Sequence, residues 1–275
     1  MFGGRRTDGE RMEELMRRAG DALDTGDSEA AEELSRQVLR LNSDSLEAKD
    51  LLASAIMGQE RFGEAVPLLT DLTHAFPDDA SCLVDLGLCL FQVCEFAQAS
   101  SVVRRALAIS PLDPHANYLA GLCEEREGRI AMADERFRLA ARQAPEDYTV
   151  PIRLSREEFD AALTEALDEL PGEIRDALDT VAVLVEDVPA EHHLRAYDPP
   201  LDPLVLGLYT GVPRDERSTG DLPGLPDVVN LYQRNLEHDC TTRDGLVREI
   251  RTTVLHEVGH YLGFDEEELE TRGLS

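Results

Sequence analysis

Apolar and polar positions in the first half of the chain follow a pattern that repeats every 34 residues. One column of the repeat holds Ala31, Ala65, Ala99 and Ala133, and a second column holds Ser43, Pro77, Pro111 and Pro145. A period of this length is typical of helix-turn-helix repeats, whose stacked units bury a continuous core. Proline ends the second helix of a unit because it cannot continue one. Residues 10–150 are therefore predicted to form about four stacked pairs of helices.

The fourth unit carries the fullest set of repeat positions, with Gly121, Ala133, Phe137, Ala140 and Pro145. With these residues the array resembles the tetratricopeptide repeat. The first unit is the weakest, because Arg18 and Ser35 stand where the pattern requires apolar side chains. A terminal repeat with a wetter outer face shows this feature. The resemblance implies an all-α solenoid.

The same resemblance implies a concave face that binds a protein or peptide partner. We expect this face to be lined by Val84, Leu88, Phe91, Tyr118 and Leu122. Some members of the family hold a C-terminal carboxylate with lysine and asparagine, but Lys49 is the only lysine of this chain. An apolar or basic partner segment is therefore expected.

Composition limits the classes of molecule that the protein can bind and the cellular compartment in which it is expected. The 275 residues carry a formal net charge of −29, which excludes a generic binder of nucleic acid or of anionic membranes. The five cysteines have no paired spacing, and such cysteines are core thiols of a reducing compartment. The first residues lack the apolar run of a signal peptide, and no stretch is apolar enough to span a bilayer. We expect a cytoplasmic protein.

The 34-residue period stops after Pro145, and residues 151–275 are predicted to form a second domain. Ser155 and Glu158 are spaced as a capping box that opens a helix, and Pro171 ends this helix. Segments rich in β-branched and aromatic residues predict strands within 180–188, 204–212 and 227–237.

A last helix is predicted to begin at Thr241 or Thr242, with Asp244 placed to complete a capping box. It should end at Gly263, since glycine suits the left-handed position that follows a helix. Its buried face is expected to hold Leu246, Val247, Ile250 and Val254.

The sequence HEVGH lies in the last two turns of this helix. His256 and His260 are four residues apart, so both can bind one cation at about 2.0–2.1 Å from a ring nitrogen. Glu257 lies one position round the helix, where it can contact a metal-bound water as a general base. A catalytic zinc needs a third protein ligand, and a turn at Gly263 would bring Glu266 back towards the metal. Two solvated histidines, or a zinc site without hydrolytic activity, are the alternatives.

The motif HEVGHYLGFDEEEL, with LGLYTGVPRDERS, LPDVVNLYQRNLE and LVREIRTTVLHEVGH, resembles the small bacterial zincin-like metallopeptidases of pattern HExxHxxGxxD. The resemblance covers roughly residues 152–272 and implies a compact α+β zincin fold that binds Zn²⁺. It implies that His256 and His260 are metal ligands and that Glu257 is the catalytic base. At the third ligand the chain departs from the pattern. The matching position holds Glu266 and Asp265 precedes it, so either carboxylate can be the ligand.

Several other polar residues are weaker candidates for a role in metal binding or catalysis. His238 and Cys240 precede the last helix and are expected to lie in its entry loop rather than to bind metal. Tyr209, Tyr232 and Arg234 lie on predicted strands, where one of them can stabilise an oxyanion. His192 and His193 are expected to be solvated.

Together these features predict an all-α repeat solenoid followed by an α+β minimal zincin domain. The repeat array would recruit a protein or peptide, and the second domain would hydrolyse a peptide bond with a zinc-activated water. The alternative is a non-catalytic interaction scaffold whose zincin domain holds a structural or vestigial metal. The enzyme is favoured because Glu257 is not needed for metal binding and is nevertheless present.

Overall fold

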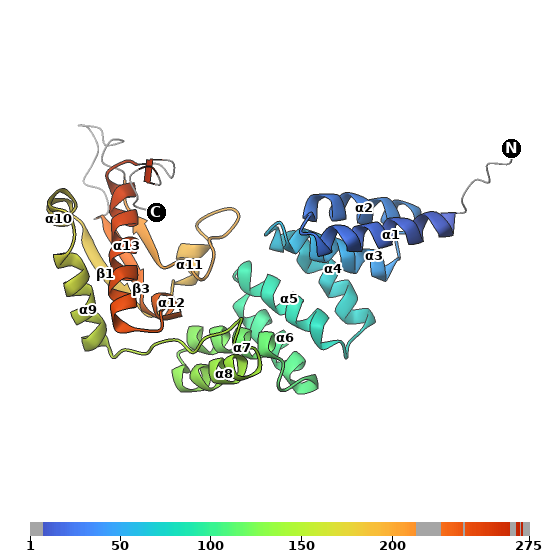
Figure 1. Cartoon of the computed structure of the whole chain (residues 1–275), viewed down its shortest axis with the longest axis horizontal. Coiled ribbons are helices and arrows are strands. Elements are labelled where there is room, and N and C mark those ends of the chain that lie inside the picture. The colour runs from blue at the N-terminus through green and yellow to red at the C-terminus, as the bar shows by residue number, and fades with distance from the viewer. Residues whose placement is uncertain (1–7, 213–226, 239, 265–267, 270, 272–275) are drawn as a thin grey trace. The chain divides into compact units, whose positions relative to one another are not determined.

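The computed structural model describes residues 8–212, 227–238, 240–264, 268–269 and 271 (Figure 1). The chain divides into two compact units, Met1–Cys123 and Glu124–Ser275. Helix α7 (Pro114–Arg126) runs through this division. The repeat period predicted a boundary at residues 150 and 151, whereas the compact units divide inside the fourth repeat.

The first unit is built from antiparallel pairs of helices, which confirms the predicted helical-repeat solenoid. Its elements before α7 are α1 (Asp8–Asp24), α2 (Ser28–Leu41), α3 (Leu46–Met57), α4 (Phe62–Ala75), α5 (Ala80–Gln92) and α6 (Phe96–Ile109). The alanine column is fully buried at Ala31, Ala65 and Ala99, because the helices of a pair approach closely there. Helices α2, α4 and α6 each end two residues before Ser43, Pro77 and Pro111, as the proline column predicted.

The turn inside each repeat has the same backbone conformation in all four units. Gly26, Glu60, Cys94 and Gly128 have φ angles of 77°, 58°, 62° and 74°, and these positions are spaced by the repeat period. The two glycines adopt the left-handed region readily, whereas a residue with a Cβ atom does so at a cost of about 1 kcal/mol. Glu60 and Cys94 therefore take this conformation because the packed helix pair requires it.

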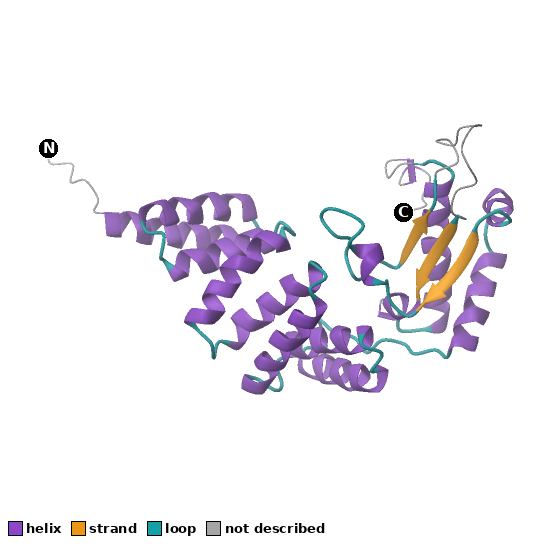
Figure 2. Cartoon of the chain, turned by 180° about the vertical axis from the view of Figure 1, so that it is seen from behind, coloured by secondary structure: helices purple, strands orange, loops and turns teal. Residues whose placement is uncertain are grey.

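The second unit places helices on one face of a small mixed sheet (Figure 2). After α7 it contains α8 (Ile130–Gln143), α9 (Arg156–Asp168), α10 (Gly172–Leu178), β1 (Ala182–Glu186), α11 (Glu191–Leu194), β2 (Gly207–Thr210), β3 (Val228–Tyr232), α12 (Gln233–His238) and α13 (Arg243–Tyr261). The strand order is β1-β3-β2, with β1 parallel and β2 antiparallel to β3. This arrangement confirms the predicted α+β class of the second half.

The core of this unit lies between the sheet and helices α9 and α13. Val229 and Leu231 of β3 point into it, and the four residues predicted for the buried face of the last helix are at most 4% exposed. The capping box of Ser155 and Glu158 opens α9 as predicted. Because α13 packs along the sheet, its second half is held against β2, and this is the half that carries HEVGH.

Two local predictions are wrong. The strand predicted over 227–237 ends at Tyr232, and residues Gln233–His238 form α12 because Gln233, Asn235 and Glu237 are buried and bonded to tertiary partners. The capping box at Asp244 is absent. The hydroxyl of Thr242 accepts from the Gly245 N–H at 3.1 Å, which makes Thr242 the N-cap and places Asp244 one position too early.

Among the helices within the described residues, none has the length and apolar character that crossing a bilayer requires. The five cysteines, all within those residues, are buried and remain thiols.

Candidate metal centre and partner surface

The last two turns of α13 bring the two histidines of HEVGH together. The Nε2 atoms of His256 and His260 lie 3.1 Å apart, and the ring centroids lie 4.7 Å apart. Both side chains are half-buried. The helix supports this pair because residues four positions apart share a face, and Val254 and Val258 anchor the opposite face in the core.

This pair fits a tetrahedral metal ion. Two nitrogens bound to zinc at about 2.0–2.1 Å with tetrahedral angles are separated by about 3.3 Å. The observed 3.1 Å between the two Nε2 atoms matches that requirement. Imidazole nitrogen is also a preferred zinc donor. His256 and His260 would therefore hold the metal.

The third ligand predicted from the sequence, Glu266 or Asp265, lies outside the described residues. Within the described ranges, no group of three His, Cys, Asp or Glu side chains is arranged to hold a metal ion. The choice between the two carboxylates stays a prediction.

The end of α13 has the turn geometry that a returning chain needs. Gly263 has a φ angle of 90°, the Gly263 N–H donates to the His260 carbonyl, and the Phe264 N–H donates to the Gly259 carbonyl, each at 3.0 Å. This is the Schellman arrangement predicted by the glycine. Beyond the turn, Leu269 is fully buried, and a Cβ atom at Gly259 would lie 2.2 Å from its Cδ2 atom. The glycine inside HEVGH therefore leaves room for Leu269 to pack against α13.

Glu257 lies on the side of α13 that faces strand β2. Its side chain is 8% exposed, and one carboxylate oxygen accepts a hydrogen bond from the backbone N–H of Tyr209 at 2.6 Å. Among the described strands β2 pairs only with β3, so this N–H is on the outer edge of the sheet. The bond fixes the orientation of the carboxylate.

The close approach of α13 to β2 depends on Gly207. A Cβ atom there would lie 2.7 Å from Cγ2 of Thr253 and 3.1 Å from Cγ of Glu257. Any larger residue would push the helix or the Glu257 side chain away. The importance of Gly207 and Tyr209 N–H was not predicted, because neither carries a motif in the sequence.

The three residues predicted as candidates for oxyanion stabilisation differ in their surroundings. Tyr209 donates its hydroxyl to Asp227 at 2.8 Å, and its ring packs edge-on against Tyr261 at 6.0 Å. Tyr232 is fully buried, its hydroxyl has no hydrogen-bond partner among the described residues, and burial raises its pKa. Arg234 pairs with Glu237 at 2.8 Å instead of pointing to the metal helix.

Three of the remaining histidines contact side chains other than those of HEVGH. His238 lies 2.7 Å from Glu125 and packs edge-on against Phe137, as a structural residue of the helix before α13. Cys240 is buried in the core. His192 and His193 lie on α11 with ring centroids 4.1 Å apart, and His193 is half-buried although it was expected to be solvated.

Only three of the five residues predicted to line the partner surface of the first unit are accessible. Val84, Leu88 and Tyr118 are half-buried and so remain partly accessible. Phe91 and Leu122 are only 1% and 4% exposed, which makes them core residues. Phe91 packs edge-on against Phe96 with ring centroids 5.3 Å apart.

Carboxylates lie beside this surface. Asp50, Val84 and Tyr118 occupy the same position of three successive repeats, and Asp85 follows Val84. Burial, with the negative charges of Asp50 and Asp79, raises the pKa of Asp85 to about 6. Burial and the charge of Asp79 raise the pKa of Asp50 as well.

Comparison with known families matches both halves of the chain. Residues 178–274 match the model of the zincin-like metallopeptidases, and residues 57–123 match that of the tetratricopeptide repeat. The chain thus carries a tetratricopeptide-repeat region followed by a zincin-like metallopeptidase domain. The metallopeptidase family implies zinc binding.

Two solved structures illustrate the structural similarity. A MamA structure from Desulfovibrio magneticus RS-1 has 19% identity and a TM-score of 0.46, over 50% of this chain and 78% of that one. Another crystal structure of MamA has 23% identity and a TM-score of 0.44, over 50% of this chain and 80% of that one. No functionally curated protein matches the chain.

Proposed function

We propose that the chain is a zinc-dependent peptidase whose repeat array recruits a protein or peptide. The observation that carries the proposal is the arrangement on α13. Two histidine nitrogens lie 3.1 Å apart on this helix, and the residue that follows the first histidine has a carboxylate oriented by the backbone of a neighbouring strand. A site that only stores metal needs the histidines but has no use for an oriented Glu257.

The chain's own residues supply a ligand set and a base. The chemistry that a zinc ion supplies at such a site is polarisation of the scissile carbonyl and activation of a water molecule. His256 and His260 would hold the ion, with Glu266 or Asp265 as third ligand. The Glu257 carboxylate would accept the proton of the attacking water and pass it to the leaving amine. The Tyr209 N–H would keep that carboxylate in place.

The repeat array is proposed to bind its partner through Val84, Leu88 and Tyr118. Asp50 and Asp85 add negative charge at that surface, and burial together with the crowding of neighbouring carboxylates raises the pKa of both side chains. A lysine or arginine side chain would relieve this crowding, which favours a partner segment with both apolar and basic residues. The buried thiols of all five cysteines support a reducing, cytoplasmic location.

The alternative function is a non-catalytic scaffold that holds a structural or vestigial metal. One experiment separates the two: the zinc content of the purified chain and its cleavage of casein, each with and without a chelator. Zinc together with chelator-sensitive cleavage supports the peptidase. Zinc without cleavage of casein, or of proteins captured by the array, favours the scaffold.

A further inference from the structure

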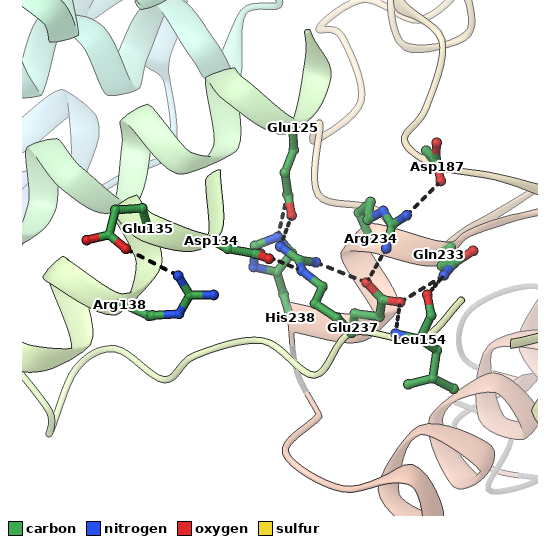
Figure 3. Close-up of polar contacts among 11 residues, drawn as sticks. Glu125, Asp134, Glu135, Arg138, Leu154, Asp187, Gln233, Arg234, Glu237 and His238 are labelled. Atoms are coloured by element: carbon green, nitrogen blue, oxygen red, sulfur yellow. Dashed lines mark hydrogen bonds and ion pairs between the residues drawn. The ribbon is translucent and has the colours of Figure 1, made fainter. Parts of the chain in front are cut away.

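A buried polar network joins four segments of the second compact unit (Figure 3). It includes the end of α7, helix α8, the segment that links α8 to α9, and helix α12. Helix α12 directly precedes α13, the helix that carries HEVGH. The residues of the network are Glu125, Asp134, Arg153, Leu154, Gln233, Arg234, Glu237 and His238.

Arg153 connects three carboxylates from different helices. Its guanidinium contacts Glu125 of α7, Asp134 of α8 at 2.8 Å and Glu237 of α12 at 2.9 Å. The side chains of Glu125 and Glu237 are 2% and 0% exposed. Arginine suits three acceptors on different helices because its planar group carries five N–H donors spread over three nitrogens.

Glu237 receives further donors on the other side of the network. Its carboxylate accepts from the Leu154 N–H at 3.1 Å, from Gln233 at 2.8 Å and from Arg234 at 2.8 Å. Gln233 also donates to the Leu154 carbonyl at 3.0 Å. A buried carboxylate with this many donors is fully satisfied only while the linking segment lies against α12.

His238 makes a second connection between the same helices. Its Nε2 atom lies 2.7 Å from the Glu125 carboxylate, and its ring packs edge-on against Phe137 of α8 at 4.9 Å between centroids. The Ile152 N–H donates to the Cys240 carbonyl at 3.3 Å, so backbone bonds accompany the side-chain contacts. Residues 152–154 are therefore held along α12 rather than acting as a loose tether.

We propose that α8, which the repeat pattern assigns to the array, is a structural part of the peptidase-like domain, fastened to α12 by Arg153 and Glu237. A buried ion network adds little when intact, but loss of one member leaves the others charged and uncompensated. Separating the array from the second domain at residues 150 and 151 would remove Glu125 and Asp134 from Arg153. This inference holds whether or not the metal centre is catalytic.

Native-state hydrogen exchange of the full chain tests the proposal without any substitution. In a denaturant series, amides of α8 should open together with those of α9, α12 and α13, because one cooperative unit contains them. Amides of α4 and α6 should follow a separate isotherm. Opening of α8 with α4 and α6 would overturn the proposal.

An Arg153→Gln substitution in the full chain tests whether Arg153 is the residue that fastens α8 to α12. It should accelerate exchange in α8 and α12 together and lower the melting temperature of their unit by about 10 °C. The matched control is Arg138→Gln, since Arg138 pairs with Glu135 on α8 at 3.2 Å with both side chains more than half exposed. This control should change neither helix.

A milder substitution covers the case in which Arg153→Gln does not fold. Arg153→Lys keeps the charge but has no fork to span three carboxylates, so α8 and α12 should still exchange faster together. If either Arg153 variant alters the linking segment alone and leaves α8 and α12 as in the wild type, the network does not fasten α8.

Discussion

The backbone N–H of Tyr209 donates a hydrogen bond of 2.6 Å to the Glu257 carboxylate, which joins an edge strand to the metal helix. The two residues are 48 positions apart in the sequence. This bond orients a carboxylate that metal binding does not require. We therefore expect substitutions that affect Glu257 to lower activity more than metal content, and substitutions of the histidine pair to remove the metal.

Glu257→Gln should keep zinc and lose hydrolysis by about 100-fold or more, because a general base moves a proton without ligating the metal. The amide has almost the same volume as the carboxylate, so α13 should stay folded. The measurement is zinc stoichiometry beside casein turnover. A variant as active as the wild type would disprove the proposed role of Glu257.

His256→Ala combined with His260→Ala should abolish zinc binding, since the pair supplies two of the expected protein ligands. Wild-type chain should carry about one zinc ion. The control is His192→Ala with His193→Ala, another histidine pair of the same domain, which should leave the zinc content unchanged. Unaltered zinc in the first double variant would show that the site is assigned wrongly.

Single substitutions should identify the third ligand. Glu266→Ala is expected to weaken zinc binding as well as activity, because loss of one ligand from a short chelating segment reduces affinity. Asp265→Ala should do so only if that carboxylate is the ligand. Zinc dissociation constants of both variants, measured by competition with a chromogenic chelator, decide between them. Equal affinity to wild type in both would place the ligand elsewhere.

Gly207→Ala should destabilise the second unit by about 1–3 kcal/mol, because the added Cβ atom overlaps Thr253 and crowds Glu257. Activity should fall more than zinc content, since the crowded group is the proposed base and not a proposed ligand. Gly172→Ala is the control, because a Cβ atom there meets nothing within 4 Å. Urea unfolding of both variants gives the comparison, and equal stability of the two would contradict the close approach of α13 to β2.

Asp85→Asn should stabilise the chain at pH 8 and lose that advantage progressively as the pH falls from about 6 to below about 4. The pKa of Asp85 is about 6 in the folded chain because of burial and the nearby Asp50 and Asp79, and it is about 3.9 in an unfolded one. Folding therefore favours the protonated acid, and stability contributed at low pH is lost as the pH rises through 6. The gain at pH 8 should be about 1–2 kcal/mol.

Replacing Asp71, which pairs with Lys49, should change stability in the opposite direction. The hydrogen bond and charge of Lys49 lower the pKa of Asp71, so its ionised form supports the fold above its unfolded pKa. Asp71→Asn should therefore lower stability at pH 8. Thermal unfolding of both variants across this pH range provides the measurement. A destabilising Asp85→Asn at pH 8 would show that burial and the neighbouring carboxylates do not disfavour ionised Asp85.

The repeat helices could be predicted because their signal is local and periodic. An alanine every 34 residues and a proline after each second helix reflect packing and chain termination within a single unit. The left-handed turns at Glu60 and Cys94 left no such signal, since neither residue prefers that conformation. The same limit explains Phe91 and Leu122, whose burial depends on neighbouring helices that the repeat pattern does not place.

The sequence predicts a strand where the structure has a helix with buried polar residues. Residues 227–237 read as one strand, yet the chain turns into α12 after Tyr232 because Gln233 and Glu237 bond to Leu154, far away in sequence. Similarly, Thr241 and Thr242 are equivalent N-cap candidates in the sequence. Only the backbone path into α13 selects Thr242.

The sequence alone determined the histidine pair that is proposed to bind metal and the turn after it, because HEVGH and Gly263 act within one helix whose geometry is fixed. The tertiary structure decided which backbone group holds Glu257 and which helix completes the second unit. Both depend on residues such as Tyr209 and Arg153, which carry no motif and gain their roles only when distant segments are packed together. Packing of that kind is cooperative, and no local pattern in the chain encodes it.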